Sequence, residues 1–380
     1  MLSSSHKKRG TAVVVGAMLL ATLAACGGSS DTEASSAGAE GGGSGESYSW
    51  QYANYLPPTS SLSTGIVNYF DAVEAGGNVE IEEFYQEALL SATDIMPGVS
   101  QGRADLGFTI ALYHPGELPL SQIVGVPFQT DDAEAQVRAM NDLYETNDAF
   151  RGEWEKQGVH VLSFVPLAPT MVATADPLPG YDGLAGKKIR AVGLLSQAMQ
   201  SAGVNPVALP APEVYESVER GVIEGFTSYP FDVAVAGSMN EVAPYMTDPG
   251  TGLYNLGALI ITKSLWDGLD DQTKTLLTEQ VDEYVPNSIE LLAEEEKKQC
   301  DVFLEAGGTA SVFSEQDVKK FESAVGDKVI DAWRAQVVKA GVAEGDADAF
   351  LKEYQAALTE QSAASNYVPG LVACAERAGS

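Results

Sequence analysis

The sequence predicts an α/β fold made of two similar lobes with a ligand cleft between them. One strand–helix–strand–helix–strand order can be read twice along the chain. Each copy also has a glycine that ends the second helix, followed by an acidic residue, a glycine and a phenylalanine entering a strand: GRADLGF at 102–108 and GVIEGF at 221–226. With 45% hydrophobic and 20% charged residues, the composition is typical of a globular protein. A single continuous doubly wound domain is the alternative interpretation.

The first copy begins near residue 47. Alternating aromatic and polar residues indicate its strands, a residue of Thr59-Ser60-Ser61 can cap the first helix, and Gly102 ends the second. The predicted elements are a strand over 47–56, a helix ending at 75, a strand over 79–86, a short helix over 94–101 and a strand over 104–112.

The second copy begins at Lys187. Gly203 and Gly221 end its helices, and Pro212 suits the first turn of the second helix. The predicted elements are a strand over 187–193, a helix over 194–203, a strand over 204–210, a helix over 212–221 and a strand over 222–229.

The C-terminal third is predicted to be mostly helical. Residues 264–308 form a largely helical region that Pro286 should kink or interrupt. Residues 315–363 form amphipathic helices, because apolar residues recur there at helical spacing. These residues are Phe321, Val325, Val329 and Trp333. The last 16 residues are too polar to span a membrane.

In open α/β sheets, ligands bind beyond the carboxyl ends of the strands, so the cleft should lie where the two lobes meet. We expect the first lobe to comprise residues 48–167 and 254–293. The second lobe comprises residues 168–253 and 294–380, including the C-terminal helices.

The N-terminus has the pattern of a secreted bacterial lipoprotein. Basic residues at 7–9 precede an apolar run at 11–25, which is too short for a comfortable membrane span. The run ends in LAAC, which resembles a lipobox in which Cys26 becomes the lipidated first residue. We predict a signal peptide over 1–25 and a flexible Gly/Ser-rich tether over 26–47. A plain signal peptide or an uncleaved anchor is the alternative.

Two further cysteines, Cys300 and Cys374, complete the set of three. Thiol pairs outside the membrane tend to oxidise, so we predict a disulfide that pins the C-terminal tail to the helix carrying Cys300. Two separate buried thiols are the alternative.

Charge and motifs exclude several functions. The chain has 22 basic and 53 acidic residues, a net charge of −31 that repels phosphate backbones, so nucleic acid is not an expected partner. It lacks GxSxG, P-loop, HExxH and EF-hand patterns, and His114 and His160 have no obvious serine or cysteine partner. We therefore expect no enzymatic activity, no cofactor and no metal.

Arg190 is one of few cations and lies near the end of the predicted interior strand KKIRAVG. A guanidinium fork binds a carboxylate through two hydrogen bonds. Taken alone, a surface arginine paired with an acidic neighbour is the simpler interpretation.

The segments around Arg190 resemble the signature of DctP-type solute receptors of TRAP (tripartite ATP-independent periplasmic) transporters. The resemblance covers roughly residues 48–305. Its segments are GKKIRAVG at 186–193, GVNPVALPAPEVYESVERGVIEG at 203–225, YPFD at 229–232, SQGRADLGF at 100–108 and LPLSQIVGVPF at 118–128.

The resemblance implies a type II periplasmic-binding-protein fold, a clamshell that closes on an organic anion. Arg190 matches the family's signature arginine, which binds the ligand carboxylate. The predicted ligand site also includes Asn54, Tyr55, Gln86, Tyr113, Thr170, Ser228, Tyr229, Phe231 and Tyr254.

The sequence departs from the family pattern at three places. Before Pro230 it is one residue longer, so Ser228 and Tyr229 compete for one cleft position. The second arginine of many sugar-acid-binding members is absent near Thr170, and Leu-Tyr-His-Pro at 112–115 replaces a charged pair. The pocket is therefore more aromatic and less cationic, which favours an aromatic or small hydrophobic monocarboxylate over a sialate-like sugar acid.

Together these observations predict an extracytoplasmic, lipid-anchored, monomeric solute receptor that delivers an organic acid to the membrane permease subunits of a TRAP transporter. A receptor for an ABC importer or a sensor is one alternative. A secreted α/β enzyme is the alternative from a different class.

Overall fold

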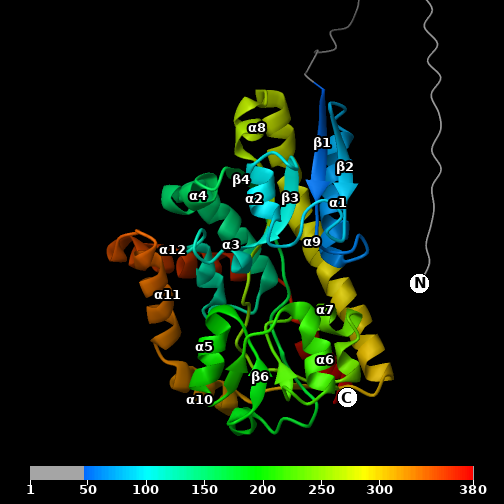
Figure 1. Cartoon of the computed structure of the whole chain (residues 1–380), viewed down its shortest axis with the longest axis vertical. Helices are drawn as coiled ribbons and strands as arrows, with labels where there is room; N and C mark the ends of the chain where they lie inside the picture. The colour runs from blue at the N-terminus through cyan, green and yellow to red at the C-terminus, as the bar shows by residue number, and fades with distance from the viewer. Residues whose placement is uncertain (1–46, 380) are drawn as a thin grey trace, which may run out of the picture. The chain divides into compact units, whose positions relative to one another are not determined.

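The computed structural model describes residues 47–379, which belong to a compact unit spanning residues 45–380. The predicted signal peptide, Cys26 and nearly all of the predicted tether lie outside the described residues. Two mixed sheets, each flanked by helices, form the framework of this unit (Figure 1).

The first sheet has five strands in the order β2-β1-β3-β10-β4. β1 pairs in parallel with β2 and β3, whereas β10 runs antiparallel to β3 and β4. β10 is buried along its whole length, as its uninterrupted apolar run GALII requires. The strands are β1 (Tyr48–Ala53), β2 (Val79–Phe84), β3 (Leu106–Ile110), β4 (Val159–Val165) and β10 (Gly257–Thr262).

The second sheet has six strands in the order β11-β9-β5-β8-β6-β7. β6 pairs in parallel with β7 and β8, while β5 is antiparallel to β8 and β9. The strands are β5 (Val172–Thr174), β6 (Lys188–Arg190), β7 (Asn205–Val207), β8 (Gly225–Phe226), β9 (Tyr245–Asp248) and β11 (Thr309–Val312).

All ten elements of the two predicted repeats are confirmed. The first repeat is β1-α1-β2-α2-β3 and the second is β6-α5-β7-α6-β8. Of the three candidate caps Thr59, Ser60 and Ser61, the structure selects Ser60, whose side chain accepts a hydrogen bond from the Ser63 backbone nitrogen at 3.2 Å. The helices are α1 (Ser61–Glu74), α2 (Ile95–Ser100), α5 (Gly193–Ser201) and α6 (Val214–Glu219), which follows the short 3₁₀ turn η4 (Ala211–Glu213).

The glycine that precedes phenylalanine in both repeats has a steric cause. A Cβ atom at Gly107 would lie 2.6 Å from the Ile95 side chain in α2, and one at Gly225 would lie 2.2 Å from the Ala173 carbonyl oxygen in β5. In both places a neighbouring element approaches so closely that only glycine fits.

A single long helix, α9 (Asp271–Glu305), follows α8 (Lys263–Gly268) and packs against helices of both sheets, α1 and α7 (Phe231–Ala236). Figure 1 shows it in yellow, passing from α1 towards α7. Of the two predicted effects of Pro286, the interruption is wrong, because α9 continues through this residue, while the kink stays a prediction.

The predicted C-terminal helices are confirmed, and their four recurring apolar residues are buried. α12 packs on α3, and α11 contacts α5 of the second repeat. Trp333 of α11 donates to the Pro119 carbonyl oxygen at 3.0 Å. The C-terminal helices thus touch elements of both predicted lobes, whose boundaries stay a prediction. These helices are α10 (Glu315–Val325), α11 (Lys328–Lys339), α12 (Glu344–Ser362) and α13 (Gly370–Ala378).

The other elements are short connections or cover the first sheet. None of the helices in the described part of the chain is both long and apolar enough to cross a membrane. The elements are α3 (Ala133–Thr146), α4 (Asp148–Glu155), η1 (Ala111–Tyr113), η2 (Ser121–Gly125), η3 (Tyr181–Leu184) and η5 (Met239–Glu241).

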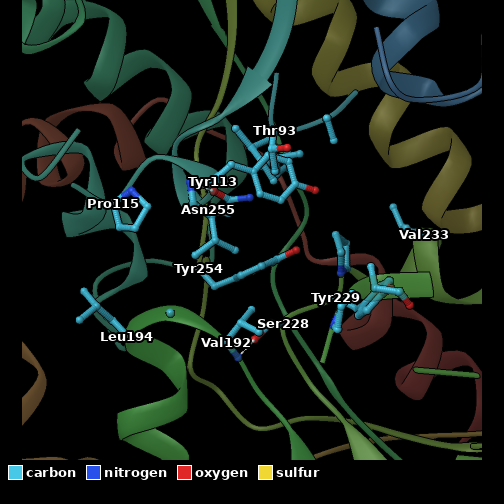
Figure 2. A pocket seen from close by; sticks show the side chains of 18 of the residues that line it. Thr93, Tyr113, Pro115, Val192, Leu194, Ser228, Tyr229, Val233, Tyr254 and Asn255 are labelled. Atoms are coloured by element: carbon cyan, nitrogen blue, oxygen red, sulfur yellow. Dashed lines mark hydrogen bonds between the residues drawn. The ribbon is translucent and has the colours of Figure 1, made fainter. Parts of the chain in front are cut away.

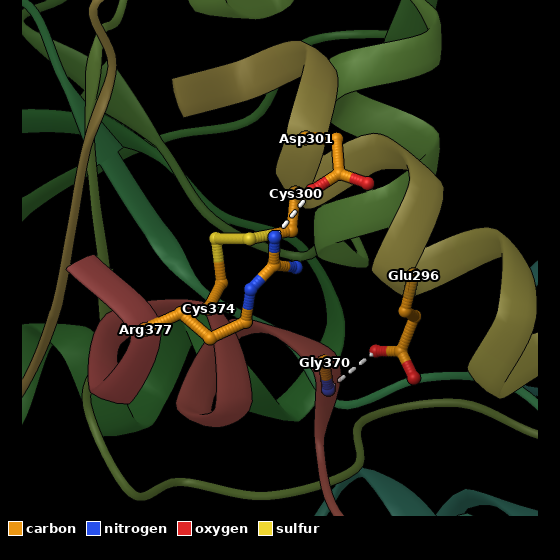
Figure 3. Close-up of a disulfide and its surroundings, with 6 residues drawn as sticks. All are labelled: Glu296, Cys300, Asp301, Gly370, Cys374 and Arg377. Atoms are coloured by element: carbon orange, nitrogen blue, oxygen red, sulfur yellow. Dashed lines mark hydrogen bonds and ion pairs between the residues drawn. A yellow bond between two sulfur atoms is a disulfide. The ribbon is translucent and has the colours of Figure 1, made fainter. Parts of the chain in front are cut away.

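Cys300 of α9 and Cys374 of α13 form a disulfide, as the sequence predicts (Figure 3). One turn earlier, Glu296 accepts a hydrogen bond from the Gly370 backbone nitrogen at 2.9 Å, at the start of α13. Tyr367 donates to the same carboxylate at 2.8 Å. The C-terminal segment is therefore held on α9 by a covalent bond and by a buried polar cluster.

Candidate ligand-binding site

A cavity of about 790 Å³ opens where the ends of both sheets meet. Its size suits a small organic ligand. It is lined by residues that follow β1, β3, β6 and β8, at the carboxyl ends of these strands, and by the 254–255 segment and α11. Figure 2 shows Tyr254 extending across the middle of the cavity, with Tyr113 on one side and Ser228 on the other.

Arg190, the last residue of β6, lines this cavity and is only 6% exposed. Its Nη1 donates to the carbonyl oxygens of Thr227 and Ser228, both at 3.1 Å, and its Nε donates to the Leu209 carbonyl oxygen at 3.2 Å. The ring of Tyr229 lies under the guanidinium, 5.2 Å from Cζ to the ring centroid. These contacts hold the fork in one orientation.

The guanidinium of Arg190 has no acidic partner among the described residues. Its three hydrogen bonds go to neutral carbonyl groups, and Nη2 donates to no described residue. Burial lowers the pKa of Arg190, and the groups that act against this shift are the phenols of Tyr229, Tyr254 and Tyr113. The interpretation as a surface arginine with an acidic neighbour is wrong. A buried cation without an acidic partner is suited to bind an anionic ligand.

Tyrosines form much of the cavity wall. Tyr55 stacks on Phe108 with 5.7 Å between ring centroids and meets Tyr113 edge-on at 6.0 Å. Burial raises the pKa values of Tyr55, Tyr113 and Tyr254, so all three phenols are neutral at physiological pH. The wall offers aromatic faces and neutral hydroxyl groups.

Ser228 and Tyr229, which the sequence left competing for one position, both line the cavity. Ser228 adopts a left-handed backbone conformation, with φ of 61°. Its hydroxyl accepts from the Val192 backbone nitrogen at 3.2 Å, while the Tyr229 hydroxyl donates to the Ala211 carbonyl oxygen at 3.1 Å. The turn at Ser228 thus lets two consecutive side chains face the ligand space.

Six of the ten predicted ligand-site residues line the cavity: Arg190, Tyr55, Tyr113, Ser228, Tyr229 and Tyr254. Four do not. Asn54 is buried, donates to Tyr52 and Ser63, and accepts from the Leu56 backbone nitrogen at 2.9 Å, so it positions the loop that carries Tyr55.

Thr170 and Phe231 also lie behind the cavity wall. The Thr170 hydroxyl accepts from the Ser228 backbone nitrogen at 3.0 Å and so supports the cavity turn. Phe231 is 1% exposed and packs edge-on against Phe303, with 5.6 Å between ring centroids. Gln86 is exposed and does not line the cavity, whereas its neighbour Glu87, which is also exposed, lies at the cavity wall.

Several lining residues were missed because they come from segments without a recognisable motif. Gln336 of α11 reaches the cavity from far along the chain, and its Nε2 donates to the Pro115 carbonyl oxygen at 2.8 Å. Gln122 and Asn255 also line the cavity. Among the described residues, no group of three His, Cys, Asp or Glu side chains is arranged to hold a metal ion.

The two α/β halves, with a cavity at their strand ends and inside it a buried cation that has no acidic partner among the described residues, have the architecture of a solute-binding protein. The chain belongs to the DctP family, described as bacterial extracellular solute-binding protein family 7, whose model matches residues 52–336. The predicted resemblance to receptors of TRAP transporters is thereby confirmed, as is the two-lobed binding-protein fold. Proteins of this family are extracytoplasmic substrate-binding proteins of transport systems.

Two relatives with named ligands share about a quarter of the aligned residues with this chain. The ectoine-binding periplasmic protein TeaA of Halomonas elongata is 24% identical over 220 residues, which are 57% of this chain and 60% of TeaA. The match thus spans less than two thirds of that relative. The 2,3-diketo-L-gulonate-binding periplasmic protein YiaO of Escherichia coli is 25% identical over 258 residues, 67% of this chain and 77% of YiaO.

Solved structures share the fold. A TRAP periplasmic solute-binding protein of Desulfovibrio salexigens, in an open form, superposes with a TM-score of 0.70 at 26% identity, covering 82% of this chain and 96% of that one. A TRAP solute-binding protein of Rhodoferax ferrireducens with copurified benzoate gives a TM-score of 0.73 at 18% identity, covering 83% and 99%.

Proposed function

We propose that this chain is a lipid-anchored receptor that captures an organic acid, an aromatic or small hydrophobic monocarboxylate, and delivers it to a TRAP permease in the membrane. The observation that carries the proposal is Arg190, a buried guanidinium with a fixed orientation and no acidic partner among the described residues. A ligand carboxylate that loses its water in the cavity needs such donors.

The cavity wall supports the aromatic part of the proposal. Tyr55, Tyr113, Tyr229 and Tyr254 surround the space in front of Arg190, and their rings offer flat apolar surface to a planar ligand. The Rhodoferax ferrireducens protein of the same fold was found with benzoate, which is a ligand of this kind.

Other relatives carry other ligands in their names, including ectoine, diketogulonate and C4-dicarboxylates. We favour a monocarboxylate because Arg190 is the single basic residue among the described residues that line the cavity. Membership of the DctP family favours a TRAP permease over an ABC importer as the partner. We propose that the receptor works as a monomer.

Benzoate is the probe that tests this function. A saturating concentration of about a hundred times Kd should stabilise the receptor by about 2.7 kcal/mol, because the folded state alone binds the ligand. The lobes should also close around it, which would reduce the radius of gyration in X-ray solution scattering. If benzoate and related hydrophobic monocarboxylates change neither the melting temperature nor the radius of gyration, the proposal is wrong.

Anchoring gives a separate prediction, which rests on LAAC ending at Cys26. The variant Cys26→Ser lacks the thiol that would carry the lipid, so the protein should be released from the membrane or remain as an unprocessed precursor. Stable anchoring takes more than one acyl chain, and a processed Cys26→Ser protein would carry none. Membrane fractionation should therefore show it leaving the membrane fraction. A variant that is processed and retained in the membrane fraction like the wild type would exclude the lipoprotein form.

A further inference from the structure

The cavity contains two opposite charges, and neither has a charged partner. Arg190 and Glu87 are the two charged residues among the described residues that line it. Oε1 of Glu87 accepts a hydrogen bond from the Ala92 backbone nitrogen at 2.9 Å. Within residues 47–379 no donor reaches its Oε2, and no basic residue forms an ion pair with it. Both an anion-binding group and a cation- or donor-binding group are therefore available to one ligand.

Tyr113 lines the cavity together with both charged residues. Burial raises the pKa of its phenol, Arg190 lowers the pKa and Glu87 raises it. One hydroxyl group is thus within electrostatic reach of both side chains. Arg190, Glu87 and Tyr113 all line this one cavity of about 790 Å³, so a ligand that fills it can meet both charges.

The loop that carries Glu87 is held in an unusual backbone conformation. Gln86 and Glu87 are consecutive left-handed residues, with φ of 54° and 61°. This region is sparsely populated for residues other than glycine, and such geometry persists where the surroundings enforce it. The Gln86 backbone nitrogen donates to the Leu56 carbonyl oxygen at 3.2 Å, which fixes the loop beside the cavity wall at Leu56.

We propose that Glu87 sets the ligand selectivity of this receptor: it accepts a monocarboxylate that carries a hydrogen-bond donor, ammonium or hydroxyl, opposite its carboxylate, and it rejects dicarboxylates. The inference rests on the proposed function, since it requires the ligand carboxylate to bind Arg190. The donor then faces the free oxygen of Glu87. A second carboxylate at that place would meet a like charge.

The experiment uses four benzoates that share one carboxylate and one ring. They are benzoate, para-(aminomethyl)benzoate, para-(hydroxymethyl)benzoate and terephthalate, titrated calorimetrically into the full receptor. Terephthalate should bind at least tenfold more weakly than benzoate, because its second carboxylate would face the like charge of Glu87. The two donor-bearing acids should bind several-fold more tightly than benzoate, which is typical of one charge contact near a surface. Comparing the affinities of the two donor-bearing acids shows whether the site prefers an ammonium or a hydroxyl group.

The variant Glu87→Gln removes the charge and keeps a side-chain oxygen for the Ala92 nitrogen. It should bring terephthalate to within about threefold of benzoate and abolish the preference for the ammonium compound. Glu80→Gln is the matched control: it makes the same charge change on β2 at an exposed residue that does not line the cavity. It should leave all four affinities unchanged.

The outcomes separate the two proposals. If wild type binds benzoate but Glu87→Gln keeps the wild-type order of affinities, the selectivity role of Glu87 is wrong and the proposed function stands. The same holds if wild type prefers terephthalate. If wild type binds none of the four acids, the proposed function fails and this inference fails with it.

Discussion

Replacing Arg190 by alanine should nearly abolish ligand binding. The guanidinium is 6% exposed and has no acidic partner among the described residues, so the ligand carboxylate would be its only counterion. Removing one partner of a buried, hydrogen-bonded charge pair typically costs about 2–5 kcal/mol, which is roughly a 30-fold to several thousand-fold rise in Kd. Calorimetric titration with benzoate, or with any acid found bound to the purified protein, measures the effect.

Arg190→Lys tests whether geometry matters beyond charge. A lysine keeps the positive charge but cannot replace a planar fork that donates to Thr227, Ser228 and Leu209 while presenting Nη2 to the ligand. This variant should also bind poorly. Wild-type affinity in Arg190→Lys would mean that charge alone suffices.

Folding has to be checked in these variants, because Arg190 also donates hydrogen bonds to three backbone carbonyl groups. Thermal unfolding without ligand separates a loss of fold from a loss of affinity. Arg220→Ala serves as the matched control, since Arg220 is an exposed arginine paired with Glu216 and does not line the cavity. It should bind like wild type. Wild-type affinity in a folded Arg190→Ala protein would move the carboxylate site elsewhere.

The parts of the fold that the sequence predicted are those with local signals. The ten elements of the two repeats are marked by alternating patterns, the cap at Ser60 and the glycines that end helices. β10 and β4 have no comparable signal: β10 is a uniformly buried run that pairs with strands about 100 and 150 residues earlier in the chain. The order of strands within each sheet depends on such distant pairings, which no local pattern encodes.

The site residues divide in the same way, between those with a local sequence signal and those brought together by distant packing. Arg190 was found because it lies within a recognisable segment at the end of a strand. Gln336 was missed because α11 reaches the cavity only through the packing of the C-terminal helices. The prediction of Gln86 missed Glu87 by one position: both residues are left-handed and exposed, but only Glu87 lines the cavity. Asn54 and Thr170 were placed in the right region but support the wall from behind.

Loss of the disulfide should produce the largest change in stability. Cys300 and Cys374 are separated by 74 residues and each is 1% exposed. By the loop-entropy relation, a crosslink over such a loop stabilises the folded state by about 4 kcal/mol. The helix it holds, α13, spans nine residues and would be marginal alone, so its docking depends on its partners.

The other contacts of α13 determine how much of its docking remains once the disulfide is removed. Besides the disulfide, α13 is held by the Glu296 carboxylate, which accepts from Gly370 and Tyr367, and by the ion pair of Arg377 with Asp301 (Figure 3). Burial, together with the nearby Asp232 carboxyl group, raises the pKa of Glu296 to about 8. We expect these contacts to keep α13 docked without the disulfide, but with a smaller free energy of unfolding.

The double variant Cys300→Ala, Cys374→Ala should therefore fold, bind ligand with unchanged Kd, and unfold with a free energy lower by about 4 kcal/mol in urea. Neither cysteine lines the cavity, so affinity is the readout that separates a local loss of stability from a disturbed site. Val302→Ala, an exposed change on the same helix, should cost less than about 0.5 kcal/mol. Reduced wild-type protein should behave like the double variant. Two free thiols in protein secreted by its native host, or a double variant as stable as wild type, would show that α13 is held without the crosslink.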